Sequence, residues 1–418
     1  MSLNVGRLRP LNFSLAKLAA SAVAALSLVF LSACNDAPTD IGYSLLNDTV
    51  NVGTIASTPD TLLIASTGTS LYFEELFNTG KMFIGAANGT KAAALIRFSK
   101  IPDSLADLKQ SDIVSAKYLI YVDRYALGDT VAGKLSFDVK RINQPWTNLA
   151  SWDSLSAAGF QGETVGSFDE KITYKDSGFI QIPIDAKLIS DWTQRAGDTI
   201  PNNPGIALVP NSGASVINSF YSLGITSTPP PGENKLEIVY RRSDGSTATV
   251  KINAAIEKSV IKAPDYDPNM IEIMGAAVLY AKIDFDIPSN VVRPLSGIHK
   301  AELTLTTDLS QVKVGNFGMP KYLRGEYTDK FESASGNVPS FEGGWVSQDD
   351  YSQMRFPNII SAIERITRKG GKGSIIIRPF DFTNQYHRAD KLVFFGANAD
   401  WDKRPKLKII YSTAPSIK

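Results

Sequence analysis

Side chains that usually carry out catalysis are rare in this chain. Its 418 residues include two histidines, His299 and His387, and one cysteine, Cys34. A zinc site takes three or four protein ligands, which two distant histidines cannot supply. A nucleophilic serine needs a neighbouring base, and no Gly-x-Ser-x-Gly elbow occurs in the sequence. We therefore expect a non-catalytic protein, with a hydrolase of dispersed carboxylates as a less favoured alternative.

Two segments combine several oxygen ligands at alternate positions. "DYDPN" offers Asp265 and Asp267, and "NADWD" offers Asn398, Asp400 and Asp402. Such spacing suits Ca²⁺, but an EF-hand loop beginning at Asp265 would need Gly and Glu where Met270 and Ala276 stand. Solvated loop carboxylates are the favoured interpretation, and a structural Ca²⁺ is the alternative.

Aromatic residues are the remaining candidates for ligand contact. Trp146 and Trp152 lie six positions apart in "PWTNLASW", and three tyrosines lie on or beside a nearby apolar run, namely Tyr118, Tyr121 and Tyr125. Exposed aromatic rings suit sugars, because they combine an apolar face with a polar group. Most tryptophans in small β-domains are instead packed in the core. Trp146 and Trp152 are thus candidate ligand contacts, with core packing as the favoured interpretation.

The surroundings of Cys34 indicate export. Basic residues precede an apolar stretch at 18–33, whose last three residues form "LSAC" together with Cys34. This order is typical of a secretory signal, and the stretch is short for a membrane-spanning helix. "LSAC" resembles the lipobox of bacterial lipoproteins, which implies cleavage after residue 33 and lipid on Cys34. We therefore expect a signal peptide at 1–33, a polar tether at 34–54 and a lipid-anchored protein of the cell envelope, most simply at the outer membrane.

Removing residues 1–33 takes away three basic residues and no acidic one, so the formal net charge of +1 becomes −2. This near-neutral balance offers no extended positive field for nucleic acid. With Cys34 lipidated, no thiol remains for a disulfide. The exported part must therefore be stabilised by its hydrophobic core alone.

The elements that would position these residues read as short strands. Apolar runs such as "AKYLIYV", "FIQIPI" and "KLEIVY" are separated by Gly, Pro, Asn, Asp and Ser. In "KLSFDVKRI", Leu135, Phe137 and Val139 alternate with polar residues, which is typical of a half-buried strand. Many short strands with turn residues between them predict an all-β fold of sandwich type.

The strand pattern occurs twice in the chain. The matching pairs are "IRFSKIP" with "IDFDIP", "SAKYLIYV" with "KAELTLTT", "GIALVP" with "SIIIRP", and "NKLEIVY" with "PKLKIIY". Because the four pairs keep the same order, we expect two tandem jelly-roll-like sandwiches at 55–243 and 247–414. The polar "RSDGS" at 242–246 would be the hinge between them.

Each copy also contains one segment with helical periodicity. Ile184, Leu188 and Trp192 share one face in the first copy, and Ile359, Ile363 and Ile366 do so in the second. A membrane or partner helix is one interpretation. The favoured one is a short helix that covers an end of each sandwich.

Together these segments resemble DNRLRE-type domains. The likeness rests on "MFIGAANGTKAAALIRFSKIP", "VSAKYLIYV", "PWTNLASW", "IDAKLISDW" with "NPGIALVP", and "LEIVY". It covers residues 58–242 and, more loosely, 250–413, where Asp284 replaces the basic Arg97 and the paired tryptophans are missing. The resemblance implies β jelly rolls of surface and secreted bacterial proteins, some of which bind polysaccharide.

We therefore expect a non-catalytic envelope lipoprotein that acts in adhesion, as a scaffold or as a binding module. Its partners would be the membrane, through Cys34, and polysaccharide or other envelope proteins, but not nucleic acid. An accessory carbohydrate-binding protein of a polysaccharide-degrading system is the alternative.

Overall fold

In the computed structural model, the described residues are 51–71, 79–172, 178–224, 232–276, 279–288, 297–328, 339–380 and 388–413. The predicted signal peptide, Cys34 and most of the tether lie outside them. The fold is all-β, with one sheet of 10 strands and one of 11, both antiparallel. This confirms the predicted fold class, and residues 52–413 form one compact unit.

The first sandwich is built from the ten-stranded sheet. Its strands are β3 (Thr79–Ala87), β4 (Thr90–Phe98), β5 (Ile113–Gly128), β6 (Leu135–Ile142), β7 (Gln161–Glu170), β8 (Phe179–Pro183), β9 (Ile206–Pro210), β10 (Val216–Gly224), β11 (Lys235–Arg241) and β12 (Thr247–Lys262). Their order is β12-β11-β5-β10-β3-β4-β9-β6-β7, with β8 beside β5 and β12 also paired with β4. The 16-residue strands β5 and β12 each change partner midway, so they are shared by both layers.

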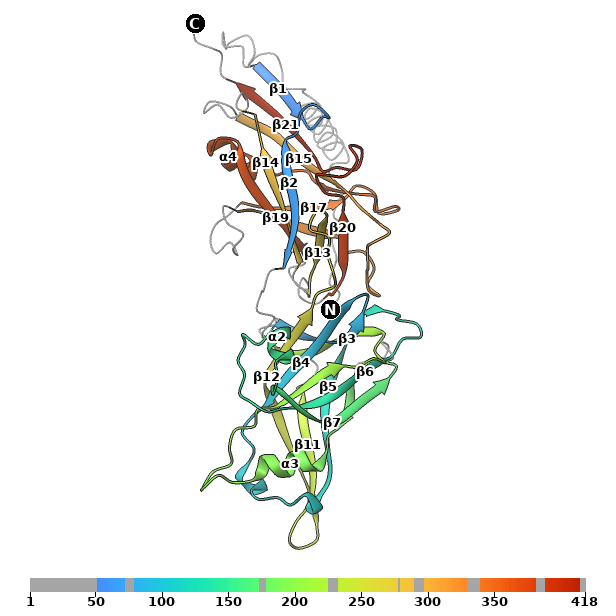
Figure 1. The fold of residues 1–418 in the computed structure, drawn as a ribbon, viewed down its shortest axis with the longest axis vertical. Helices are drawn as coiled ribbons and strands as arrows, with labels where there is room; N and C mark the ends of the chain where they lie inside the picture. Colours follow the sequence, from blue (N-terminus) through green and yellow to red (C-terminus); the bar gives the residue numbers. More distant parts are fainter. Residues whose placement is uncertain are drawn as a thin grey trace, which may run out of the picture. The chain divides into compact units, whose positions relative to one another are not determined.

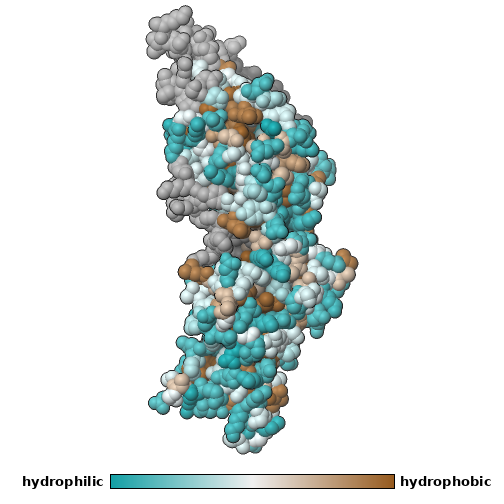
Figure 2. Space-filling model, in the orientation of Figure 1, coloured by the Kyte–Doolittle hydropathy of each residue, from teal (hydrophilic) through white to brown (hydrophobic). Residues whose placement is uncertain are grey.

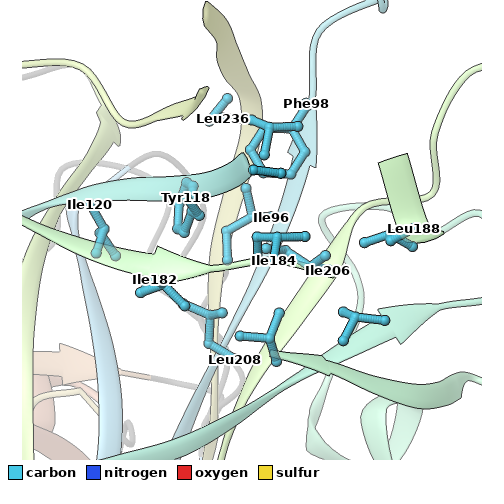
Figure 3. Close-up of a cluster of buried hydrophobic side chains, with 14 of the residues drawn as sticks. Ile96, Phe98, Tyr118, Ile120, Ile182, Ile184, Leu188, Ile206, Leu208 and Leu236 are labelled. Atoms are coloured by element: carbon cyan, nitrogen blue, oxygen red, sulfur yellow. The ribbon is translucent and has the colours of Figure 1, made fainter. Parts of the chain in front are cut away.

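Alternating residues of these strands fill the core. Figure 3 shows Ile96, Phe98, Tyr118, Ile120, Ile182, Ile184, Leu188, Ile206, Leu208 and Leu236 converging between the layers. Helix α3 (Ala186–Thr193) adds Leu188, Ile189 and Trp192 to this core. It starts where Asp185 accepts a hydrogen bond from the Lys187 amide at 2.8 Å. The predicted end-covering helix is thus confirmed, and a five-residue helix α2 (Trp152–Ser156) accompanies it.

The second sandwich repeats this plan with the 11-stranded sheet. Its strands are β1 (Asn51–Ala56), β2 (Ile64–Leu71), β13 (Ile271–Met274), β14 (Leu279–Asp286), β15 (Gly297–Thr306), β16 (Tyr322–Thr328), β17 (Ser340–Trp345), β18 (Gln353–Phe356), β19 (Lys372–Phe380), β20 (Lys391–Phe394) and β21 (Lys406–Thr413). Helix α4 (Ile360–Arg368) buries Ile363 and Ile366, and Gly370 and Gly371 end it with positive φ angles of 85° and 87°. The predicted second helix is confirmed.

The two sandwiches exchange their first strands. β1 and β2 precede the first sandwich in the chain, yet they pair with β21 and β14 of the second. Figure 1 shows these two blue strands among the orange and red ones. Conversely, β12 pairs with β11 and β4 of the first sandwich before the chain enters the second. The first sandwich is therefore one contiguous segment, whereas the second combines residues 51–71 with the strands from residue 271 onward.

The segment 242–246 has a different role from the expected hinge. Arg242 donates from its amide to the Ser246 carbonyl at 2.8 Å, and Tyr240 pairs with Ala248 across the turn. Gly245 has a φ of 83°, a conformation that glycine adopts readily. The chain thus turns back here as the β11–β12 hairpin, and the expected sequence boundary between two sandwiches at 243–247 is replaced by the strand exchange.

A mixed apolar and polar junction joins the sandwiches. Phe83, Tyr125 and Ile217 form one buried cluster with Met274 and Leu279. The Tyr125 hydroxyl accepts a hydrogen bond from the Ala389 amide at 2.9 Å and donates to Asp390 Oδ1 at 3.1 Å. The two halves therefore share both core and hydrogen bonds.

Candidate binding surface on the first sandwich

Trp146 and Trp152 do not form an open platform. Trp146 is 5% exposed, and its indole Nε1 donates to the Pro204 carbonyl at 2.8 Å. It belongs to a buried cluster with Leu95 and Leu155, against which half-buried Trp152 also packs. The ring of Trp146 is thus used in packing, in agreement with the favoured interpretation of the sequence.

The carboxylates considered for calcium lie in two loops, after β12 and after β20. Asp267 Oδ1 accepts a hydrogen bond from the Asn269 amide at 2.8 Å, and Asp400 lies 3.6 Å from Lys403 Nζ. The other three candidates, Asp265, Asn398 and Asp402, have exposed side chains. Within the described ranges, no group of three or more His, Cys, Asp or Glu side chains is placed to hold a metal ion.

A row of aromatic side chains crosses three adjacent strands on the outer face of the first sandwich. Phe179 of β8 and Tyr121 of β5 are cross-strand partners, with ring centroids 4.9 Å apart and an interplanar angle of 82°. Tyr221 of β10 follows across β5, 5.5 Å from Tyr121. Because Ile120 and Val122 face the core, Tyr121 must face outward. We name Phe179, Tyr121 and Tyr221 the aromatic row.

The row is partly open. Phe179 is 42% exposed, whereas Tyr121 and Tyr221 are half-buried. Gly232 lies against the ring edges, since a Cβ at this position would come within 2.7 Å of Phe179 and 3.0 Å of Tyr121. The accessible ring is therefore that of Phe179, which packs edge-to-face against Tyr121 on the neighbouring strand.

A buried ion pair continues the row onto β3. Lys81 is the cross-strand partner of Tyr221, and its Nζ lies 3.5 Å from the centre of that ring. The same Nζ is 2.6 Å from Asp123 Oδ1, and Ser219 donates to Asp123 Oδ2. Burial favours neutral Asp123, but the Lys81 ammonium and these hydrogen bonds outweigh it and lower the pKa of the carboxyl below its usual value. The cation–π contact and the ion pair together fix Tyr221.

Asn234 and Glu257 hydrogen-bond the backbone next to the row, where β5 changes its partner strand from β11 to β10. Asn234 accepts a hydrogen bond from the Tyr121 amide and donates to the Tyr221 carbonyl, both at 2.8 Å. It also donates to Glu257 Oε1 at 2.7 Å. Glu257 further accepts from Tyr118 Oη at 2.9 Å and from the Leu223 amide at 2.8 Å. Burial raises the pKa of Glu257, although these three donors favour its charged form.

The second sandwich has no aromatic row at the corresponding place. The repeat aligns Tyr121 with Thr306, and Gln353 is the cross-strand partner of Thr306 where Phe179 is the partner of Tyr121. Both sandwiches nevertheless form the same strand pairs here. Aromatic rings at the places of Tyr121 and Phe179 are thus not required by the fold.

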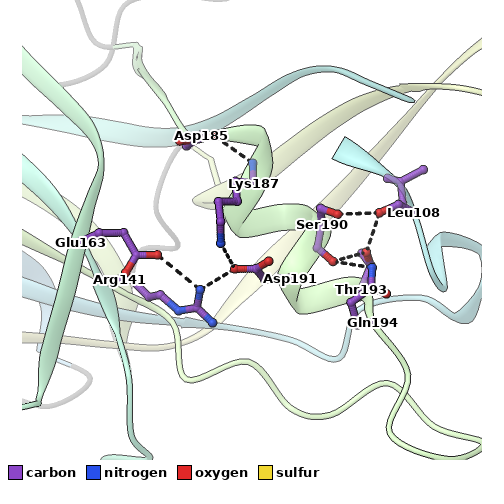
Figure 4. Close-up of polar contacts among 9 residues, drawn as sticks. All are labelled: Leu108, Arg141, Glu163, Asp185, Lys187, Ser190, Asp191, Thr193 and Gln194. Atoms are coloured by element: carbon purple, nitrogen blue, oxygen red, sulfur yellow. Dashed lines mark hydrogen bonds and ion pairs between the residues drawn. The ribbon is translucent and has the colours of Figure 1, made fainter. Parts of the chain in front are cut away.

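The charged cluster beside α3 has a structural explanation. Figure 4 shows Arg141 reaching Asp191 at 2.6 Å and Glu163 at 3.4 Å, while Lys187 reaches Asp191 at 2.8 Å. These pairs tie the helix to β6 and β7. Their acidic and basic groups neutralise one another, so the cluster offers no unpaired group for chemistry.

Exposed apolar side chains elsewhere are dispersed. In Figure 2, the coloured residues of the visible face show small brown groups separated by hydrophilic ones. Such isolated residues are normal on protein surfaces. The aromatic row differs from them because three rings contact one another across adjacent strands.

The sequence marks Tyr121 as a candidate but not Phe179 or Tyr221. "FIQIPI" predicts only a strand, and Tyr221 follows the strand residues "INSF" without a motif. Strand order and register bring the three residues together, and neither is encoded locally. Alternation along β5 was the one available signal, because it separates Tyr121 from Tyr118.

No protein-family model and no curated protein matches this chain. Among solved structures, that of the Macrobrachium rosenbergii nodavirus aligns at 7% identity with a TM-score of 0.10, over 95% of this chain and 96% of that chain. A similarity this low carries no argument about fold or function. Of the helices in the described ranges, none has the length and apolar character to cross a membrane.

Proposed function

We propose that this protein is a non-catalytic binding module of the cell envelope, anchored by lipid on Cys34, that contacts polysaccharide through the aromatic row. The observation that carries the proposal is the contact of Phe179, Tyr121 and Tyr221 across three strands, with Phe179 open to solvent. The lipobox-like "LSAC" supports the anchor, and the resemblance to DNRLRE-type domains supports the ligand class.

The chemistry beside the row suits sugars. An apolar ring face packs against sugar C–H groups, and nearby polar groups can bond the hydroxyls. Gln181 follows Phe179 by two residues and therefore faces the same side of β8. Lys117 Nζ donates to Gln181 Oε1 at 2.9 Å, so donors and acceptors lie next to the exposed ring. An adhesion protein on a glycan surface and an accessory carbohydrate-binding protein of a polysaccharide-degrading system would both use this contact.

The test is binding to a panel of soluble polysaccharides and a glycan array, with and without Ca²⁺. We expect Phe179→Ala to weaken binding about ten-fold, which corresponds to about 1.4 kcal/mol. Tyr322→Ala is the matched control, because Tyr322 is 49% exposed but lies on the second sandwich. The aromatic row would be refuted as the site if a folded Phe179→Ala variant bound every polysaccharide that the parent protein binds, and with the same affinity.

A further inference from the structure

The exchanged strands β2 and β12 are structurally equivalent. Each pairs antiparallel with the corresponding strand of its host sandwich, β14 and β4. Both pairings shift register at one residue, which is Ala65 in β2 and Ala255 in β12. A shared irregularity at the same place shows that both segments fill the same kind of slot.

The slot is the place beside β14 or β4 that the exchanged strand occupies. In each slot, two side-chain oxygens of the incoming strand accept hydrogen bonds from backbone amides of the host sandwich. In the second sandwich, Thr69 Oγ1 accepts from the Glu272 amide, as Ser259 Oγ accepts from the Phe83 amide in the first, both at 2.8 Å. A second matched contact, also at 2.8 Å in each sandwich, joins Thr67 Oγ1 to the Ala397 amide and Glu257 Oε2 to the Leu223 amide. The slot thus requires an acceptor at two alternate positions of the strand.

The slot of the second sandwich needs an occupant. Without β2, the edge of β14 and the amides of Glu272 and Ala397 would lose their partners, and an unsatisfied buried amide is costly. Leu63 and Ile64 of the incoming segment are buried in the core of this sandwich. An open strand edge beside an apolar groove readily pairs with another strand.

We propose that the second sandwich can take up residues 51–71 of a second copy of this chain, which would give strand-exchanged assemblies. Residues 51–71 do not pair with the first sandwich, which comes next in the chain, but with the second. Their contacts would therefore be the same if the second sandwich belonged to another molecule. Exchange of an identical element is a low-cost route to self-association. Within one chain the high effective concentration favours closure, so exchange requires opening at high protein concentration.

The test uses single cysteines in the chain from residue 35 onward, which contains no other cysteine. Gly68 and Lys282 are cross-strand partners in β2 and β14, and a Cβ at Gly68 meets its nearest atom at 3.5 Å, so a cysteine fits. Gly68→Cys and Lys282→Cys chains are mixed, opened in denaturant, refolded at high concentration and oxidised. Lys251→Cys replaces Lys282→Cys in the control, because Lys251 is exposed on β12 of the first sandwich.

A disulfide between positions 68 and 282 of two chains, found by mass spectrometry and above the level of the control pair, is the expected result. The double variant Gly68→Cys/Lys282→Cys, refolded at low concentration, should form the bond within one chain. If it does so while the mixed single variants give no more dimer than the control, exchange between copies is refuted. If the double variant forms no bond either, the register on which the proposal rests is wrong.

Discussion

Glu257 is a buried carboxylate without a cation among its described hydrogen-bond partners. Three donors converge on it, from Tyr118, Asn234 and Leu223. A carboxylate is suited to this position because it only accepts, and a buried donor left without an acceptor costs about 1–3 kcal/mol. In the second sandwich the hydroxyl of Thr67 bonds the equivalent amide, so the additional donors explain why the first sandwich uses an acid.

The raised pKa of Glu257 predicts a specific pH dependence. The folded state keeps the proton to a higher pH than the unfolded state, whose pKa is near the ordinary value of 4.5. The contribution of this group to stability is therefore complete below that value and decreases as the pH rises through the folded pKa. Glu257→Gln removes the titrating group, so the free energy of unfolding of this variant should lack this decrease. Urea titrations from pH 4 upward would show the difference.

Glutamine also places an NH₂ group opposite either Leu223 or Asn234, so we expect Glu257→Gln to be less stable by about 1–3 kcal/mol at the low end of the pH range. Glu233→Gln is the control, because the Glu233 side chain is 59% exposed. It should keep the pH slope of the parent protein. Equal slopes in the parent protein and Glu257→Gln would show that Glu257 titrates alike in both states.

At the level of elements, the strand exchange changes which fragments can fold. Residues 79–264 contain every strand of the first sandwich, β3 to β12. Residues 55–243 lack β12, so β4 and β11 each lose a partner strand. We expect the first fragment to unfold cooperatively in urea and the second to be poorly soluble or to lack a cooperative transition.

Limited proteolysis gives an independent check of the same point. The turn at 242–246 is exposed and suits a protease, but cleavage there leaves β12 paired with β11 and β4. The nicked halves should therefore remain associated through size-exclusion chromatography. A cooperatively folding 55–243 fragment, or nicked halves that separate without denaturant, would restore the hinge that the sequence suggested.

At the level of the whole molecule, the junction around Tyr125 couples the two sandwiches. Tyr125→Phe removes the acceptor of the Ala389 amide and a donor to Asp390. We expect a loss of about 1–3 kcal/mol in coupling, so that a single calorimetric transition separates into two. Tyr118→Phe is the control, because its hydroxyl lies within the first sandwich. It should lower the melting temperature without separating the transitions, whereas similar profiles for both variants would argue against coupling at Tyr125.

The anchor proposed at Cys34 lies outside the described residues and is tested on the full chain. Expressed in a bacterium with lipoprotein processing, the protein should partition into the detergent phase, because buried acyl chains contribute about 0.8 kcal/mol per CH₂. Cys34→Ser should move it to the aqueous phase or leave it unprocessed. A mature N-terminus elsewhere, with Cys34 unmodified by mass spectrometry, would rule out the anchor.

Local sequence patterns are sufficient to predict the strand-rich class, the two repeats and both end-covering helices. These features depend on local periodicity and on residues such as Asp185 and Gly370, which act on their neighbours in the chain. Alternation also placed Tyr121 on the face opposite Tyr118, although it gave no partner for that ring.

Contacts between distant strands determine which sandwich each first strand joins and which aromatic residues meet. β2 and β12 both have strand character, and nothing local distinguishes pairing with β4 from pairing with β14. Phe179 and Tyr221 reach Tyr121 from positions 58 and 100 residues away in the numbering, through the register of β8 and β10 against β5. Hydrogen bonds between distant strands set that register, and a pattern confined to one strand cannot encode it.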